Sequence, residues 1–158
     1  MPENVPTFTV YELENQPILD VTSFSNDDAV DLGLIGIEVI TEWDVSLAVD
    51  VVLEGDLVFR AKLKQTGRDN DPWLAGKAAV AVHFEEPSML VRMRHIEAGT
   101  EFTDLNLDHD VMKAHGGSIP LRVSGRVVGT LTMSGEPDGI DHAAAAETIR
   151  RFLELHEE

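Results

Sequence analysis

The sequence predicts an α+β fold in which helices flank an antiparallel sheet of about five strands. Two stretches of the chain each contain a pair of segments that alternate apolar and polar residues, and a short turn joins the members of each pair. This pattern is typical of β-hairpins, whose strands are antiparallel, so a purely parallel sheet is excluded. Segments with helical spacing lie before, between and after the two hairpins.

The chain begins with a polar, irregular stretch. Residues 1–17 are predicted to form an N-terminal arm or a short helix, and residues 18–24 are expected to form the first strand. Ser25, with Asp28 three residues later, can cap a helix that extends to about residue 43. The apolar residues of this helix spread beyond one face. We therefore expect it to be mostly buried, or to pack on both the sheet and a neighbouring subunit.

The remaining elements follow from the same two periodicities. We expect a hairpin over residues 46–64, followed by a polar loop over 65–70. Next come a helix from Asn70 or Asp71 to about Phe84, with Pro72 in its first turn, and a short helix over 87–96 that is ended by Gly99. A second hairpin over 119–134 and a helix from Asp138 or Asp141 almost to the C-terminus complete the chain. Residues 100–113 are acidic and fit neither pattern.

Composition limits the classes of protein to consider. The chain has 158 residues, enough for one domain with a hydrophobic core, which we place over residues 18–158. It has no cysteine, which excludes disulfides, thiolate metal sites and thiol nucleophiles. The formal net charge of −17 argues against binding to nucleic acids and to anionic membranes, because both are negatively charged. No segment is typical of a signal peptide or a membrane span, so we expect a cytoplasmic protein.

A histidine beside two glycines marks the first candidate segment. His115 could act as a metal or haem ligand or as an acid or base, or it could bond a nearby carbonyl and fix its loop. Gly116 and Gly117 allow the backbone to turn or to approach a ligand closely, and Ser118 follows them into a strand. A small pocket beside this loop is therefore a candidate ligand-binding site.

The second candidate segment ends the same hairpin and begins the last helix. Ser134 and Gly135 could bind an anion through backbone N–H groups, or they could form a tight exit from the strand. Asp141 in the first helical turn complements the helix dipole without any further role. His142 in the same turn should stay neutral, and neutral imidazole is the form that binds metals and haem.

The third candidate segment is the start of the helix near residue 70. Asn70 can cap this helix, and Trp73 and Lys77 lie one turn apart on the same face. In one interpretation, the tryptophan is an aromatic wall and the lysine is a cation that holds a carboxylate or phosphate. In the other, the tryptophan lies in the core and the lysine extends along the surface to solvent.

The other histidines give no comparable signal. Their spacing is not that of a metal site, so no metal site is predicted, and we expect surface or packing roles for His83, His95, His109 and His156. Carboxylates are numerous and dispersed, and no catalytic pair stands out among them. We therefore favour a binding protein over an enzyme.

The three candidate segments together resemble a known family. They are Asn70-Asp71-Pro72-Trp73 with Lys77, then His115-Gly116-Gly117-Ser118-Ile119-Pro120, and Ser134-Gly135 followed by Asp141-His142. This combination resembles the GlcG/HbpS-like group, also called the haem-degrading domain family, and especially its branch of bacterial and yeast members. The resemblance covers about residues 18–155. The chain departs from the family pattern at Gly76, where an arginine is expected, so one cation of a shared anion site is missing.

The resemblance implies a profilin-like α+β fold and a homo-oligomer, and some relatives bind haem. Our leading hypothesis is an oligomeric, non-catalytic module that binds a small anionic or cofactor-like ligand. Two alternatives stay open: a haem-binding or haem-degrading protein, and an assembly or partner-binding module in which the three segments only form subunit contacts. We expect the segments to converge on one pocket or one subunit interface, because loops at the ends of hairpins meet at one edge of a sheet.

Overall fold

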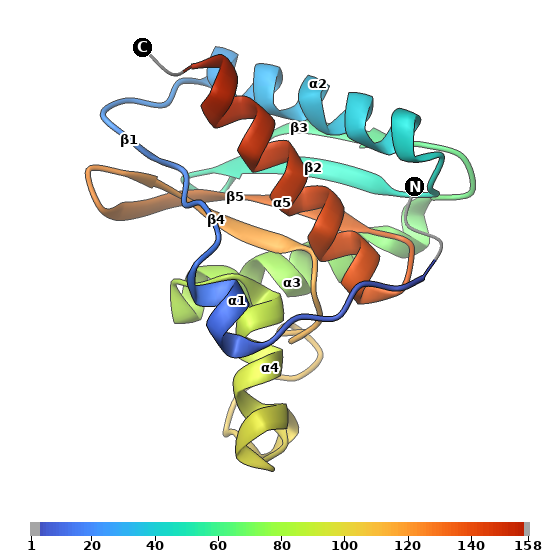
Figure 1. The fold of residues 1–158 in the computed structure, drawn as a ribbon, viewed down its shortest axis with the longest axis vertical. Coiled ribbons are helices and arrows are strands. Elements are labelled where there is room, and N and C mark those ends of the chain that lie inside the picture. The colour runs from blue at the N-terminus through green and yellow to red at the C-terminus, as the bar shows by residue number, and fades with distance from the viewer. Residues whose placement is uncertain (1–3, 157–158) are drawn as a thin grey trace.

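A five-stranded sheet in the order β1-β4-β5-β2-β3 forms the centre of the molecule (Figure 1). The computed structural model describes residues 4–156. The strands are β1 (Asp20–Val21), β2 (Ala48–Leu53), β3 (Asp56–Lys62), β4 (Ser118–Val123) and β5 (Arg126–Ser134). The α-helices are α1 (Val10–Glu14), α2 (Asn26–Trp43), α3 (Asp71–Phe84), α4 (Ser88–Ala98) and α5 (Asp138–Leu155), and the 3-10 turns are η1 (Arg68–Asn70) and η2 (Phe102–Asp104).

Two antiparallel hairpins form most of the sheet. β2 pairs with β3, β4 pairs with β5, and the hairpins meet where β2 lies antiparallel to β5. The predicted α+β class and both predicted hairpins are therefore confirmed. The helices also occur in the predicted order.

The first strand is shorter than the sequence predicts, and its pairing is parallel. A strand was expected over residues 18–24, but only Asp20–Val21 pairs, and it lies parallel to β4 at the edge of the sheet. The strand ends early because the cap of α2 follows closely. The Ser25 hydroxyl accepts a hydrogen bond from the Asp28 N–H, and the Asp28 carboxylate accepts one from the Ser25 N–H.

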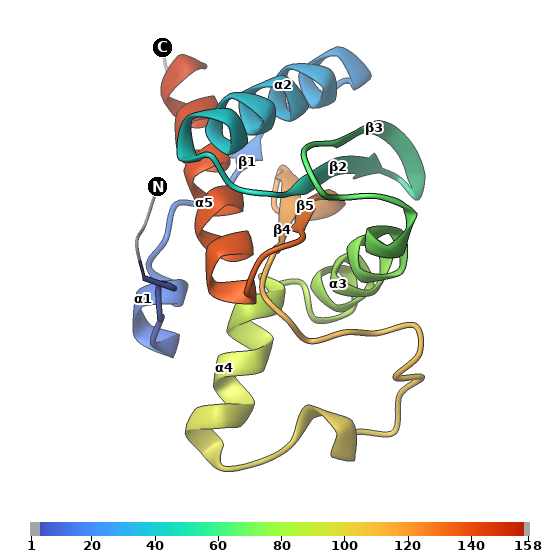
Figure 2. The ribbon, with the colours of Figure 1, turned by 90° about the vertical axis from the view of Figure 1, so that its right-hand side faces the viewer.

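Helices cover both faces of the sheet. α2 and α5 pack together on one face, whereas α3 lies on the other face beside α4 (Figure 1, Figure 2). α2 approaches β3 closely because Gly33 has no side chain, and a Cβ atom there would collide with the ring of Phe59. The wide apolar surface of α2 thus contacts two neighbours, the sheet and α5. Across residues 4–156, no helix is both long and apolar enough to cross a membrane.

Two further segments pack beside α3 and α4. Near the N-terminus, α1 lies against α4, where Leu13 is buried with Met89 and Leu90. After α4, a long loop extends away from the sheet and returns to β4 (Figure 2). This loop is held to α3 by a hydrogen bond of 3.1 Å from the Lys113 N–H to the Gly76 carbonyl. The loop supplies one side of the candidate site.

Candidate functional site

The site is built around the first two turns of α3. Pro72 lies in its first turn, and the Asn70 side chain accepts a hydrogen bond from the Gly67 N–H just before the helix. Trp73 is 41% exposed, whereas Lys77 is only 2% exposed. The interpretation with a buried tryptophan and a solvated lysine is therefore wrong. The tryptophan is available as an aromatic wall, and the lysine is a core residue.

Lys77 is buried because it has an ionic partner on α5. Its Nζ lies 2.7 Å from Asp141 Oδ2 and 3.1 Å from the Met133 carbonyl oxygen. The other Asp141 oxygen accepts a hydrogen bond of 3.0 Å from the Glu136 N–H. Burial raises the pKa of Asp141 to about 6, and the Lys77 ammonium opposes this rise. The aspartate thus does more than complement the helix dipole, because it holds α3 and α5 together.

The two glycines allow the loop to pass close to neighbouring backbone. The Gly116 N–H donates a hydrogen bond of 3.0 Å to Asp138 Oδ2. Gly117 has φ of +139°, and its carbonyl accepts a bond of 2.9 Å from the Met133 N–H. Ser118 is fully buried, and its hydroxyl lies 2.9 Å from the Thr132 hydroxyl. These three residues do not line the site; their hydrogen bonds hold the loop beside it in place.

The three candidate segments converge on one cavity, as the sequence predicts. This cavity, the Lys77 pocket, has a volume of about 400 Å³. The residues predicted from the sequence that line it are Asn70, Trp73, Lys77, His115, Ser134, Gly135 and Asp141. Arg92, Glu136, Pro137 and Asp138 complete it.

A second cavity adjoins the first and shares Trp73, Arg92 and His115 with it. This histidine pocket has a volume of about 380 Å³, and the long loop after α4 forms much of its wall. His95 and His109 line it and also pack against Phe102, in agreement with the packing role expected for them. The sequence offered no signal for them or for Arg92, because they come together only through the return of the loop.

Lys113 lines the histidine pocket beside Trp73, a residue that both pockets share. Its Nζ is 4.8 Å from the centroid of the Trp73 ring, a cation–π distance. Its aliphatic stem occupies the space over Gly76, where a Cβ atom would lie 2.6 Å from Lys113 Cγ. The space beside Gly76 is therefore filled by the stem of a lysine from the long loop. In the described part of the chain, every lysine and arginine except Arg68 and Lys113 pairs with a carboxylate.

Arg92 and His115, which line both pockets, each lie beside the carboxylate of Asp138. Arg92 forms an ion pair with Asp138, and His115 Nδ1 lies 3.8 Å from the same carboxylate. Burial lowers the pKa of His115, and Asp138 only partly opposes this effect, so the imidazole is neutral near pH 7. The His115 ring stands edge-on to Trp73, with the ring centroids 5.3 Å apart. A neutral imidazole in this position can donate or accept a hydrogen bond.

His142 lies outside both pockets. It is fully buried, its Nε2 is 2.8 Å from Gln16 Oε1, and its ring contacts the edge of Phe8. Burial lowers the pKa of His142 to about 4, so the imidazole is neutral, as the sequence predicts. Its observed partners belong to the N-terminal segment, and its position is that of a packing residue.

Comparison of the sequence with known proteins gives relatives over nearly the whole chain. Residues 24–150 match the family described as "Haem degrading protein HbpS-like". A UPF0303 protein of Streptomyces coelicolor is 40% identical over an alignment of 148 residues, which covers 92% of this chain and 94% of that protein. A UPF0303 protein of Streptomyces avermitilis is 36% identical over 148 residues, with 92% and 91% covered.

Solved structures share the fold. The Ybr137w protein superposes with a TM-score of 0.83 at 25% identity, covering 97% of this chain and 92% of that one. A doubly substituted HbpS of Streptomyces reticuli has a TM-score of 0.67 at 20% identity, with 82% and 87% covered. A complex of PduOC with haem has a TM-score of 0.67 at 20% identity, with 81% and 94% covered. Since the family match spans most of its length and the fold agrees, this chain belongs to the HbpS-like family.

Proposed function

We propose that this protein binds a small anionic, cofactor-like ligand in the groove formed by the Lys77 pocket and the histidine pocket. The observation that carries this proposal is Lys113, a cation without an ion-pair partner in residues 4–156, held over Trp73, a residue that both pockets share. In a chain with a net charge of −17, most cations are neutralised by nearby carboxylates. A lysine kept apart from them is suited to a carboxylate or phosphate of a ligand.

The surrounding side chains suit a ligand with a planar part. Trp73 is 41% exposed, and its indole ring can contact an aromatic or conjugated ring of a ligand. Lys77 has two hydrogen-bond partners within residues 4–156, and an ammonium group carries three donors, so one can serve a ligand oxygen. His115 adds a neutral donor or acceptor beside them. These groups bind and orient a ligand, and we assign the site no catalytic step.

Haem is the second candidate ligand. Three imidazoles, those of His95, His109 and His115, line the histidine pocket. His109 Nε2 donates a hydrogen bond of 2.9 Å to the Leu105 carbonyl, so in the neutral ring Nδ1 carries the lone pair, and no partner for Nδ1 occurs in the described residues. A related fold, that of PduOC, has been solved in complex with haem. Haem iron needs an axial ligand and its propionates need cations, and this pocket offers candidates for both.

We also propose that the chain forms a homo-oligomer. α2 exposes two apolar side chains one turn apart, Val30 and Leu34, with exposed fractions of 37% and 50%. Apolar residues placed together on an outer helical face are common at subunit interfaces. In the alternative function, as an assembly module, this association would be the whole role of the protein.

Titration with defined probes separates these functions. The protein is titrated with benzoate, phenyl phosphate and haemin, and the melting temperature, tryptophan fluorescence and Soret absorption are recorded. We expect the aromatic anions to raise the melting temperature. Lys113→Ala should weaken their binding about tenfold or more, the effect of losing one charge-assisted hydrogen bond. Arg68→Ala is the matched control, since it removes the other unpaired cation, which lines neither pocket.

Each alternative predicts a different result. A saturable Soret band that is lost in His115→Ala, without binding of the simple anions, would favour haem. No response to any probe, together with a change in oligomer size in the Lys113→Ala variant, would favour an assembly module. Equal affinity of wild type and Lys113→Ala for both aromatic anions would overturn the proposed role of Lys113.

A further inference from the structure

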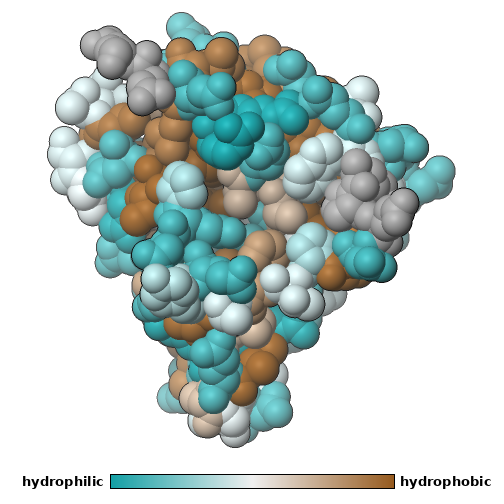
Figure 3. All heavy atoms as spheres, in the orientation of Figure 1, coloured by the Kyte–Doolittle hydropathy of each residue, from teal (hydrophilic) through white to brown (hydrophobic). Residues whose placement is uncertain are grey.

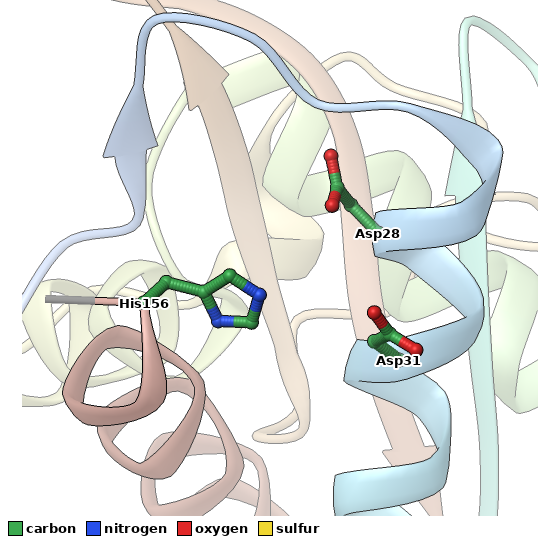
Figure 4. Close-up of side chains that lie close together, drawn as sticks. All are labelled: Asp28, Asp31 and His156. Carbon is green, nitrogen blue, oxygen red and sulfur yellow. The ribbon is translucent and has the colours of Figure 1, made fainter.

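A second group of polar side chains lies on the far side of the sheet, away from the groove. Asp28 and Asp31 project from the start of α2, and His156 follows the end of α5 (Figure 4). One potential ligand atom from each residue lies within 4.8 Å of the others. Within residues 4–156, this is the one group of three histidine, aspartate or glutamate side chains arranged closely enough to hold a metal ion.

The two aspartates are fixed on one side of α2 by their spacing. Residues three apart on a helix are neighbours on its surface, so both carboxylates face the same direction. One oxygen of Asp28 accepts the Ser25 N–H, which orients the carboxylate and leaves its other oxygen for a different partner. Two carboxylates held side by side at neutral pH repel each other, and a cation between them removes this repulsion.

The imidazole of His156 is held in the form that binds metals. Its Nδ1 lies 2.9 Å from the Phe152 carbonyl oxygen, which can only accept, so in the neutral ring Nδ1 carries the proton and Nε2 carries the lone pair. The ring also stacks on Phe152, with centroids 3.9 Å apart and planes 20° from parallel. Metal-binding histidines usually donate their second ring N–H to a carbonyl or carboxylate in this manner. This bond lies outside the group of three and leaves Nε2 as the nitrogen that can bind a metal.

We propose that Asp28, Asp31 and His156 bind one divalent transition-metal cation of the Zn²⁺ class. The mixed nitrogen and oxygen donor set favours Zn²⁺, Ni²⁺ or Co²⁺ over Mg²⁺ and Ca²⁺, which prefer oxygen ligands alone. Three protein ligands leave a fourth position for water. Bonds of about 2.0–2.2 Å to Zn²⁺ require the ligand atoms to move closer together, which the exposed side chains of Asp31 and His156 achieve by rotation.

Bound metal would tie the end of α5 to the start of α2. These helices already pack against each other, and Phe152 lies beneath the site, 5.6 Å from Phe24 between ring centroids. A metal that binds only the folded chain stabilises it by mass action. The site is therefore expected to act as a structural clamp, independent of the ligand groove on the other side of the sheet.

Metal titration of the full chain tests this inference. Protein freed of metal with EDTA is titrated with Zn²⁺ by calorimetry, in excess Mg²⁺ to occupy non-specific carboxylate sites. We expect one Zn²⁺ per chain and a rise in melting temperature. His156→Ala and Asp31→Asn should each lower the affinity about tenfold or more, at least the loss that follows removal of a supporting residue. Asp31 is preferred to Asp28 because Asp28 also caps α2.

Matched controls distinguish this site from general metal binding by an acidic protein. His83→Ala removes an exposed histidine from α3, and Asp27→Asn removes an exposed carboxylate from the same turn of α2. Both variants should keep the wild-type affinity, and metal-free melting curves establish that all variants fold. Nitrogen-15 NMR of the imidazoles should show a Zn²⁺-dependent shift at Nε2 of His156. The inference is overturned if wild type binds no Zn²⁺, if His156→Ala and Asp31→Asn bind as wild type does, or if His115→Ala abolishes binding instead.

Discussion

Lys77 and Trp73 show how a single distant partner decides which of two neighbours is buried. Both lie on one face of α3, and helical spacing alone predicts that arrangement. The burial of Lys77 depends on Asp141, 64 residues away in the sequence. Removing either charge would leave the other buried without a partner, which costs about 3–5 kcal/mol. The sequence could therefore predict that these residues share a site, but not that the lysine would be the core residue.

His142 makes the stability of the fold depend on pH. Burial lowers the pKa of His142 from 6.5 to about 4. Between pH 6.5 and pH 4, the unfolded chain takes up a proton on this histidine that the native imidazole does not, and this uptake favours unfolding. The free energy of unfolding is therefore highest above pH 6.5, as far as His142 is concerned, and decreases as the pH falls towards 4. A shift of this size corresponds to about 3 kcal/mol. Replacing His142 with Gln, which can still donate to Gln16, should make the free energy of unfolding less sensitive to acid.

Urea unfolding of wild type and His142→Gln at pH 7 and pH 4 measures this effect. The difference in unfolding free energy between the two proteins should change by about 3 kcal/mol in favour of the variant as the pH falls. The raised pKa of Asp141 acts in the opposite direction, but it is common to both proteins and cancels in the difference. His83→Gln controls for the loss of one imidazole from an exposed position. A constant difference between pH 7 and pH 4 would contradict the prediction.

At the scale of helices and strands, the sequence predicts correctly those elements that depend on residues close together in the chain. The capping pair Ser25 and Asp28 begins α2 as predicted, and period-two alternation correctly indicates both hairpins. The parallel pairing of β1 with β4 had no local signal, because the partners are about a hundred residues apart. The histidine pocket was not predicted either, because residues 100–113 fit neither the helical nor the strand periodicity and yet form its wall.

The contact between α3 and the long loop predicts that one substitution disturbs both stability and the site. In Gly76→Ala, the new methyl group would lie 2.6 Å from Lys113 Cγ and 3.0 Å from Lys113 Cβ, so the loop itself must shift to make room. Such overpacking costs about 1–3 kcal/mol, and the preference for alanine over glycine inside a helix, about 0.5–1 kcal/mol, offsets only part of it. We therefore expect the thermal stability to fall while Lys113 leaves the Trp73 ring and the binding of aromatic anions weakens.

The position of Lys113 can be followed by NMR after reductive carbon-13 methylation of the lysines. The methyl resonance of Lys113, assigned with Lys113→Arg, should be shifted by the Trp73 ring current in wild type and should lose this shift in Gly76→Ala. Gly67→Ala is the control, because a Cβ atom at that position meets no other atom within 4 Å. An unchanged Lys113 resonance in Gly76→Ala would show that the loop does not depend on the missing side chain.

At the scale of the whole molecule, net charge and apolar surface act against each other in association. Apolar side chains lie between hydrophilic ones over α2 and α5 (Figure 3), and Val30 and Leu34 are among the exposed ones. Two chains that each carry a net charge of −17 repel one another at low ionic strength. Salt reduces the range of this repulsion to about 10 Å at 0.1 M, while the apolar contact is retained. We therefore expect association to increase with salt.

Size-exclusion chromatography with light scattering, at 0.05 M and at 0.5 M NaCl, measures this balance. Wild type should elute as a species heavier than the 17.4 kDa chain, with a larger assembled fraction at the higher salt concentration. Leu34→Glu should shift it towards 17.4 kDa, because the new carboxylate would be buried against the partner without a counter-charge. Val82→Glu places the same charge on an exposed apolar residue of α3 and should leave the assembly intact. If both variants dissociate alike, the interface does not lie on α2; if wild type is a monomer in both buffers, association through this face is excluded.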